Sequence, residues 1–172
     1  MKEMVRYGFT LAIICIVASA SLAVVNAVTK SKIIAQAQAE EEASLKEVLP
    51  EAVHFEPVKS AEEIIYYRAH DKDRKLIGIA FKASGKGYSS VVETIVGMKT
   101  DGTIVAIKIL SQNETPGLGA KVAEPEFSSQ FVNKKDLADV SAITGATISS
   151  KAVIDSVKKK AEEIKALIKN ER

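Results

Sequence analysis

This sequence is poor in the residues that build metal-based redox centres. Cys15 is its only cysteine, and His54 and His70 are its only histidines. One cysteine permits no intrachain disulfide, no Cys-based zinc site and no iron–sulfur cluster held by this chain alone. Two histidines do not make a His-rich metal or haem site, and we interpret both as structural or surface residues. We therefore expect no metal site, and any electron carrier here should be organic.

Strong charge is also missing from the chain. The formal net charge of +2 is too small for a dedicated nucleic-acid binder, so we expect no nucleic-acid partner. There is no internal repeat and no low-complexity region. The sequence has only one long apolar segment, near its N-terminus, so it predicts one membrane span and not several.

That segment, residues 7–29, contains no charged residue and lies between Arg6 and Lys30. As an α-helix it is about 35 Å long, enough to cross a hydrocarbon core of about 30 Å with some tilt. The alternative is a cleaved signal peptide, because small residues at 18–20 follow an apolar half at 11–17. We favour a transmembrane helix, since apolar residues continue beyond that point. Both interpretations export the rest of the chain.

The flanking charges bear on orientation. Lys2, Arg6 and the amino terminus lie on one side of the span, and Lys30 and Lys32 lie on the other. The small excess of positive charge on the N-terminal side predicts that residues 1–6 lie in the cytoplasm and the main domain outside it. Residues 30–49, rich in Ala, Gln, Glu and Lys, predict a helical stalk that ends before Pro50.

The remaining residues, 50–172, predict one domain of the α+β class, in which an antiparallel or mixed sheet packs with helices. An irregular link with Pro57 should occupy residues 51–61. Turns are expected at residues 71–73 and at Asp101-Gly102, where glycine tolerates the positive φ of a hairpin turn. Apolar residues at helical spacing indicate a closing helix. In full, we expect strands at 63–69, 75–83, 91–98 and 103–110, and helices at 124–131 and 149–168.

A cluster of small residues precedes the closing helix. Gly145 and Ala146 let a bulky ligand approach the backbone, and a helix that starts near Ser149 offers N–H groups to an anion. Thr147 adds a hydroxyl on which a phosphodiester would be stabilised, and Ser149 and Ser150 are natural N-caps. On these residues alone, an ordinary turn followed by a capped helix is the simpler interpretation.

Two further stretches have the composition of a ligand site. The loop Glu114-Thr115-Pro116-Gly117-Leu118-Gly119 suits a ligand cradle and a plain tight loop equally, and it lacks the Gly-Lys-Ser/Thr ending of a Walker loop. Tyr88 lies between small residues, where it could stack on a planar ring. A half-buried residue at a strand end is the commoner role of such a tyrosine.

Together these stretches resemble the FMN-binding domain family, and within it the family of G subunits of the Rnf complex, the ion-translocating ferredoxin:NAD⁺ oxidoreductase. The resemblance rests on residues 114–119 and on residues 144–150, Thr-Gly-Ala-Thr-Ile-Ser-Ser, in this order after an N-terminal anchor. It covers nearly the whole chain. One position departs from the family pattern: where an Asp is common, this chain has Ser141, and the nearest acid is Asp139.

The resemblance implies that Thr147 is esterified to the phosphate of FMN by a separate flavin transferase, which uses FAD and Mg²⁺. It implies a single-pass, extracytoplasmic redox subunit of the cell (inner) membrane without catalysis of its own. Its partners would be the other membrane subunits of the complex, including a second flavin subunit and iron–sulfur subunits. The implied cofactor-binding residues are Tyr88, Glu114, Thr115, Pro116, Gly117, Leu118, Gly119, Thr144, Gly145, Ala146, Thr147, Ile148 and Ser149.

Other functions compete with this one. The C subunits of the sodium-translocating NADH:quinone reductase resemble the same family, but they are typically longer chains and the loop at 114–119 favours the Rnf type. An exported docking or assembly module would use the same fold without a redox role. A stand-alone extracellular flavin reductase usually adds a second catalytic domain, for which this chain has no room.

Overall fold

The computed structural model describes residues 2–60 and 63–170, which form two compact units. One unit ends at Glu40 and the other begins at Glu41. Helix α1 (Lys2–Val48) contains the predicted span and stalk as one continuous element. It is long and apolar enough to cross a membrane, and its apolar side chains between residues 7 and 28 are exposed. The helix ends two residues before Pro50, as the sequence predicts.

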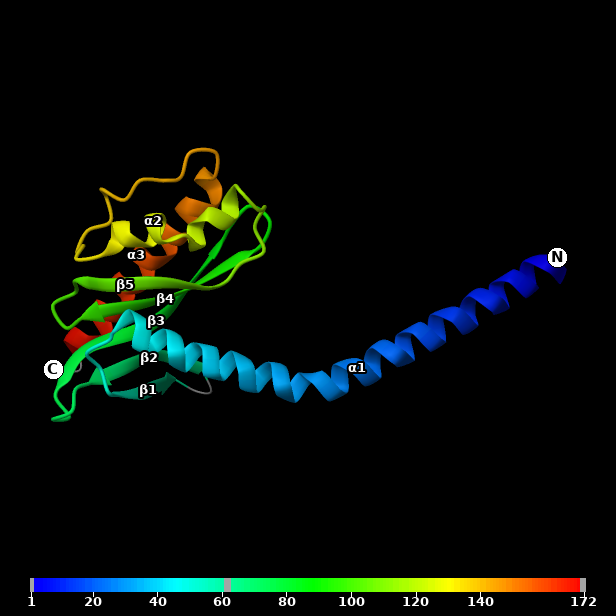
Figure 1. Ribbon diagram of the computed structural model, residues 1–172, viewed down its shortest axis with the longest axis horizontal. Helices are drawn as coiled ribbons and strands as arrows, with labels where there is room; N and C mark the ends of the chain where they lie inside the picture. Colours follow the sequence, from blue (N-terminus) through cyan, green and yellow to red (C-terminus); the bar gives the residue numbers. More distant parts are fainter. Residues whose placement is uncertain (1, 61–62, 171–172) are drawn as a thin grey trace. The chain divides into compact units, whose positions relative to one another are not determined.

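The unit that begins at Glu41 is built on an antiparallel sheet in which each strand pairs with the next one along the chain (Figure 1). This confirms the α+β class and the four predicted strands. The strands are β1 (His54–Ser60), β2 (Glu63–His70), β3 (Leu76–Lys86), β4 (Val91–Lys99) and β5 (Ile104–Ser111).

Strand β1 lies where the sequence predicted an irregular link, at residues 51–61, so that prediction is wrong for residues 54–60. The physical reason is its place at the edge of the sheet, where it pairs with β2. Pro57 has no N–H to donate, and an edge strand tolerates such a residue. Residue 61 of the predicted link lies outside the described residues.

The two predicted turns are confirmed. Gly102 has a φ of +86°, and the amide of Lys99 donates to the carbonyl of Thr103 across the β4–β5 hairpin (2.8 Å). The Asp71 carboxylate accepts hydrogen bonds from the amides of Asp73 and Lys75, both at 2.9 Å, and so shapes the turn between β2 and β3.

One face of the sheet is covered by helix α3 (Thr147–Asn170), whose Val153, Val157 and Ile164 are fully buried. A Cβ on Gly85 of β3 would lie 2.1 Å from the carbonyl oxygen of Ala152, so glycine permits this close contact. The predicted helix at 124–131 is present as two short helices, α2 (Pro125–Ser128) and η2 (Ser129–Phe131), which also pack on this face. A third short helix, η1 (Gly119–Ala123), precedes them.

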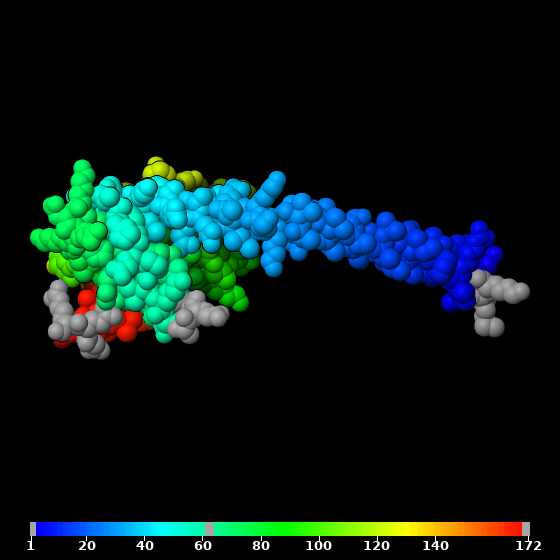
Figure 2. Space-filling model, turned by 90° about the horizontal axis from the view of Figure 1, so that it is seen from below, coloured from blue at the N-terminus to red at the C-terminus, as the bar shows by residue number. Residues whose placement is uncertain are grey.

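The opposite face of the sheet is covered by the last turns of α1, shown in cyan against the teal and green strands in Figure 2. Leu45, Val48 and Leu49 are buried there against small residues of the central strands. A Cβ on Gly97 of β4 would lie 2.3 Å from the carbonyl oxygen of Val48. The end of the long helix is therefore part of the core of the sheet unit.

Polar contacts fix the same end of α1. The Glu41 carboxylate accepts a hydrogen bond from the Tyr67 hydroxyl (2.6 Å) and pairs with the Lys82 ammonium (2.6 Å). The carboxylate and its own burial raise the pKa of Tyr67 above its ordinary value, with burial the larger cause, so the hydroxyl stays protonated and donates.

Truncation of Leu45 tests this packing. We expect Leu45→Ala to lower the stability of the sheet unit by about 2–5 kcal/mol, the usual cost of a large-to-small change in a core. Lys46→Ala, at the exposed neighbouring position, is the matched control and should change stability little. Thermal unfolding of the full chain in detergent, followed by circular dichroism, measures both; equal melting temperatures would contradict the packing.

Candidate functional site

Two tight turns shape the loops that the sequence singled out. The amide of Leu118 donates to the carbonyl of Thr115 (3.1 Å), with Pro116 second and Gly117, at φ +76°, third in the turn. The amide of Ala146 donates to the carbonyl of Ile143 (3.0 Å), with Gly145, at φ +81°, again third. A positive φ at the third position is the signature of a type II turn, which explains both glycines.

These loops meet at one end of the sheet. Lys86 pairs with Val91 at the start of β4, and Glu93 of the same strand pairs with Ser111 at the end of β5. The β3–β4 turn and the loop after β5 therefore leave the sheet at the same end. Helix α3 begins beside them, which brings residues far apart in the sequence around one hollow.

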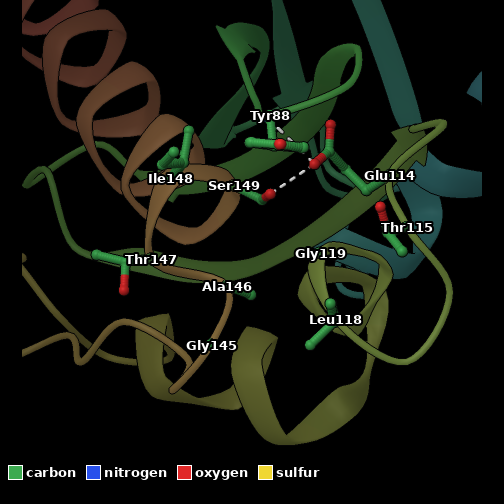
Figure 3. Close-up of a pocket in the computed structure, with 10 residues that line it drawn as sticks. All are labelled: Tyr88, Glu114, Thr115, Leu118, Gly119, Gly145, Ala146, Thr147, Ile148 and Ser149. Atoms are coloured by element: carbon green, nitrogen blue, oxygen red, sulfur yellow. Dashed lines mark hydrogen bonds between the residues drawn. The ribbon is translucent and has the colours of Figure 1, made fainter.

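That hollow is a cavity of about 420 Å³, within the size range of small-molecule and cofactor sites. Of the implied site residues, Thr144, Pro116 and Gly117 do not line it; Pro116 and Gly117 shape the first turn, and Thr144 belongs to the second. The lining residues, drawn in Figure 3, are Tyr88, Glu114, Thr115, Leu118, Gly119, Gly145, Ala146, Thr147, Ile148 and Ser149.

Helix α3 begins at Thr147, two residues before the predicted start, so the prediction that Ser149 and Ser150 act as N-caps is wrong. Both serines lie in the first turn and are buried. The Ser150 hydroxyl donates to the carbonyl of Ala146 (2.8 Å) and accepts from the amide of Ile143 (3.0 Å). The Ser149 hydroxyl instead donates to Glu114 (2.5 Å), which removes it from any capping role.

The start of α3 can hold an anion. Among the described residues, the amides of Thr147, Ile148 and Ser149 have no hydrogen-bond partner, as expected for the first turn of a helix. These N–H groups and the helix dipole give this end a partial positive charge. The Thr147 side chain is exposed at the wall of the cavity, so its hydroxyl is accessible from solvent.

Glu114 joins the three segments around the cavity, although its side chain is only 6% exposed. One oxygen accepts from the amides of Ser89 (3.0 Å) and Ser90 (2.9 Å), and from the Ser90 hydroxyl. The other accepts from the amide of Tyr88 (3.2 Å) and from the Ser149 hydroxyl. The carboxylate therefore ties the β3–β4 turn and the first turn of α3 to its own loop (Figure 3).

Hydrogen bonds keep this carboxyl ionised. Its burial favours the neutral form and raises the pKa, and this is the largest single effect. The bonds from the Ser149 hydroxyl and from the amides of Ser90, Ser89 and Tyr88 act together in the opposite direction. Their sum prevails, and the pKa of Glu114 lies below its ordinary value.

Two glycines make room for the Glu114 carboxylate. A Cβ on Gly87 would lie 2.6 Å from one carboxylate oxygen, and a Cβ on Gly119 would lie 2.7 Å from the other. Any other residue at either position would push against the carboxylate. The roles of Gly87, Ser89 and Ser90 are absent from the sequence-based predictions, because the serine bonds to Glu114 join residues 24 or more positions apart. The only local feature that pointed to these roles is the Gly-Tyr-Ser-Ser stretch at residues 87–90.

Apolar side chains surround the mouth of the cavity. Tyr88 is 74% exposed, so the expectation of a half-buried strand-end residue is wrong. Leu118 and Ile148 are also exposed, and the three come from three separate segments that line the same cavity. Exposed apolar residues gathered at a cavity are a common feature of ligand sites.

The other residues noted in the sequence lie elsewhere. The rings of His54 and His70 are 6.4 Å apart on paired positions of β1 and β2, and neither lines the cavity. Ser141 stands where the family commonly has an Asp, and its amide donates to the Gln130 side chain (2.9 Å). Asp139 is exposed and pairs with Lys134 at 3.7 Å.

Comparison with known proteins decides the family. A family profile described as FMN-binding domain matches residues 87–162, and one described as RnfG N-terminal region matches residues 1–48. The G subunit of the ion-translocating oxidoreductase complex of Methanosarcina acetivorans is 34% identical, over 91% of this chain and 92% of its own length. The chain belongs to the family of G subunits of ion-translocating oxidoreductase complexes.

Another G-subunit sequence agrees with this assignment. The G subunit of the Na⁺-translocating ferredoxin:NAD⁺ oxidoreductase complex of Acetobacterium woodii is 33% identical, over 91% of this chain and 89% of its own length. Among solved structures, NqrC of Shewanella oneidensis is 20% identical with a TM-score of 0.49, covering 69% of this chain and 74% of that one. The FMN-binding domain of this G-type chain, residues 87–162 by the profile match, contains every residue that lines the cavity.

The ionised Glu114 predicts a pH dependence of stability. Because its pKa is depressed in the folded G-type chain, its contribution is present above the ordinary value of about 4.5 and is lost as pH falls through the folded value. Glu114→Gln should cost about 1–3 kcal/mol at pH 7, the usual cost of disrupting a buried polar network. The difference in melting temperature between the wild type and Glu114→Gln should then become smaller below about pH 4.5.

Glu126→Gln, at an exposed position of α2, is the matched control and should follow the wild type at every pH. Melting curves of the three proteins between pH 3 and pH 8 make the comparison. A gap for Glu114→Gln that stays constant across this range would contradict an ionised Glu114 that stabilises the fold.

Proposed function

We propose that this chain is a membrane-anchored flavoprotein subunit that relays electrons through FMN bound covalently to Thr147 in an ion-translocating ferredoxin:NAD⁺ oxidoreductase. The observation that carries the proposal is the exposed Thr147 at the start of α3, where it lines the cavity of an FMN-binding domain. The names of the relatives support the kind of complex.

The residues around Thr147 fit a phosphoester. The unpartnered amides of the first turn of α3 supply hydrogen-bond donors for phosphate oxygens. The hydroxyls of Ser149 and Ser150 are buried and already donate to other groups, and Thr144 lies outside the cavity. Of these four residues, Thr147 alone combines exposure with a place on the cavity wall.

The attachment is a simple substitution at phosphorus. In this step the Thr147 oxygen would form a bond to the FMN phosphorus of FAD, AMP would leave with the bridging oxygen, and the hydroxyl proton would be released. A separate flavin transferase with Mg²⁺ would carry out this step. A phosphoester at this position places the negative charge of the phosphate at the positive end of α3.

The rest of the cavity suits the remainder of the cofactor. Tyr88, Leu118 and Ile148 offer apolar surface to a planar ring, and Gly145 lets it approach the backbone. Bound FMN supplies reversible uptake of two electrons. The chain itself orients the cofactor and shields part of it from water, so we expect no stand-alone catalysis.

The anchor explains how one small domain works in a larger complex. A single apolar helix holds the domain at the membrane surface and raises its effective concentration near partner centres. The partners we propose are the other membrane subunits of the Rnf complex, including a second flavin subunit and iron–sulfur subunits. The domain would face the outside of the cell membrane.

Substitution of Thr147 tests the attachment site. We expect Thr147→Ala, expressed in a native host that contains the transferase, to lose covalent flavin completely, because the accepting hydroxyl is gone. Thr144→Ala, which removes a hydroxyl three positions earlier and outside the cavity, is the matched control and should keep most of its flavin. Ultraviolet fluorescence of the denatured band in a gel measures both.

A Thr147→Ala band as fluorescent as the wild type would place the flavin elsewhere. A dark wild-type band, with flavin transferred to a control protein in the same cells, would leave residues 144–150 as an ordinary turn and helix start. The chain would then be better described as a non-redox docking module.

The proposed orientation has its own test. Cys15, the only native cysteine, lies within the apolar part of α1, so a cysteine introduced at exposed Lys158 can be followed separately. In intact cells stripped of any outer envelope, Lys158→Cys should react with a membrane-impermeant maleimide, whereas the wild type should not. Labelling of Lys158→Cys only after cell lysis would place the domain in the cytoplasm.

A further inference from the structure

The cavity has one charged wall. Of the ten residues that line it, Glu114 alone carries a charge, and its partners are backbone amides and serine hydroxyls. Other acidic residues of the described chain, such as Glu41, Asp101 and Glu163, pair with lysines. In contrast, no ion pair to Glu114 is present in the part of the chain that the structure describes, so its negative charge is bound but not neutralised by a cation.

We propose that Glu114 is a positioning residue with a second role: its carboxylate lowers the reduction potential of the flavin held in this cavity. The inference rests on the proposed function, because it requires FMN at Thr147. Thr147 lies on the opposite side of the lining residues from Glu114 (Figure 3). A cofactor tied to Thr147 that fills the cavity therefore reaches the wall that carries Glu114.

The physical basis is the interaction between like charges. Uptake of two electrons and one proton adds one negative charge to a flavin. A fixed anion nearby opposes that gain, and the effect is larger where water is excluded than in bulk solvent. The depressed pKa of Glu114 keeps the carboxyl ionised near neutral pH, so the opposition is permanent and not switched by protonation.

Glu114→Gln separates the charge from the scaffold. The Gln side chain has nearly the same shape, its carbonyl oxygen can still accept from the amides of Ser89 and Ser90, and its amide can donate to the Ser149 hydroxyl. Only the bond from the Tyr88 amide, the longest of the backbone bonds at 3.2 Å, loses its acceptor. Removal of the charge should make reduction easier by about tenfold in equilibrium constant, a positive shift of about 30 mV for a two-electron couple.

The measurement is a spectroelectrochemical titration of the purified, flavin-loaded full chain. Ser149→Ala is the matched control, because it removes one hydrogen bond to the carboxylate and keeps the charge. Its potential should equal that of the wild type or lie below it. A Glu114→Gln potential equal to or below that of the wild type would overturn the inference, as would a positive shift of the same size in Ser149→Ala.

Failure of the inference and failure of the proposed function give different results. A wild-type chain without covalent fluorescence refutes the function. A fluorescent Glu114→Gln chain with an unchanged potential refutes only the role of the charge.

If the melting curve shows that Glu114→Gln does not fold, a second variant replaces it in the test. Thr115→Lys leaves Glu114 in place and introduces a cation at an exposed position of the same wall. A positive shift of the potential then supports the electrostatic role of this wall, and an unchanged potential overturns it.

Discussion

The cavity depends on one buried carboxylate and the hydrogen bonds that it accepts. Glu114 connects the turn after β3, the loop after β5 and the first turn of α3, three segments that the chain order keeps apart. Gly87 and Gly119 leave space for the carboxylate, and the hydroxyl of Ser149 donates its hydrogen bond to it. As a result the Ser149 hydroxyl at the cavity wall is buried and already bonded, whereas Thr147 is exposed. One ionised group thus organises the shape of the site.

The sheet provides the frame for this arrangement. Helix α3 packs on one face and the end of α1 packs on the other, so each face of the sheet has its own apolar cluster. Gly85 and Gly97 permit the closest approach of each helix to the strands. A site built on packed elements of this kind holds its geometry better than one built on free loops.

Local patterns in the sequence predicted local features of the fold. The uncharged run at 7–29, the apolar segments of the predicted strands and the Asp101-Gly102 turn each carry their signal within a few residues. Strand β1 was missed because Pro57 argues against a strand, and only its edge position makes that residue acceptable. The start of α3 was misplaced because Ser149 looks like a cap, whereas its hydroxyl binds a carboxylate 35 positions away. Contacts of that range are set by the fold and have no local signature.

The central claim is that Thr147 carries the flavin, and peptide mass spectrometry tests it most directly. Trypsin should release residues 136–151, which contain the hydroxyls of Ser141, Thr144, Thr147, Ser149 and Ser150. We predict that fragment ions from the native-membrane protein place the mass of one FMN, less one water, on Thr147 alone. The same mass on any of the other four residues, or an unmodified peptide from a host with active transferase, would contradict the account.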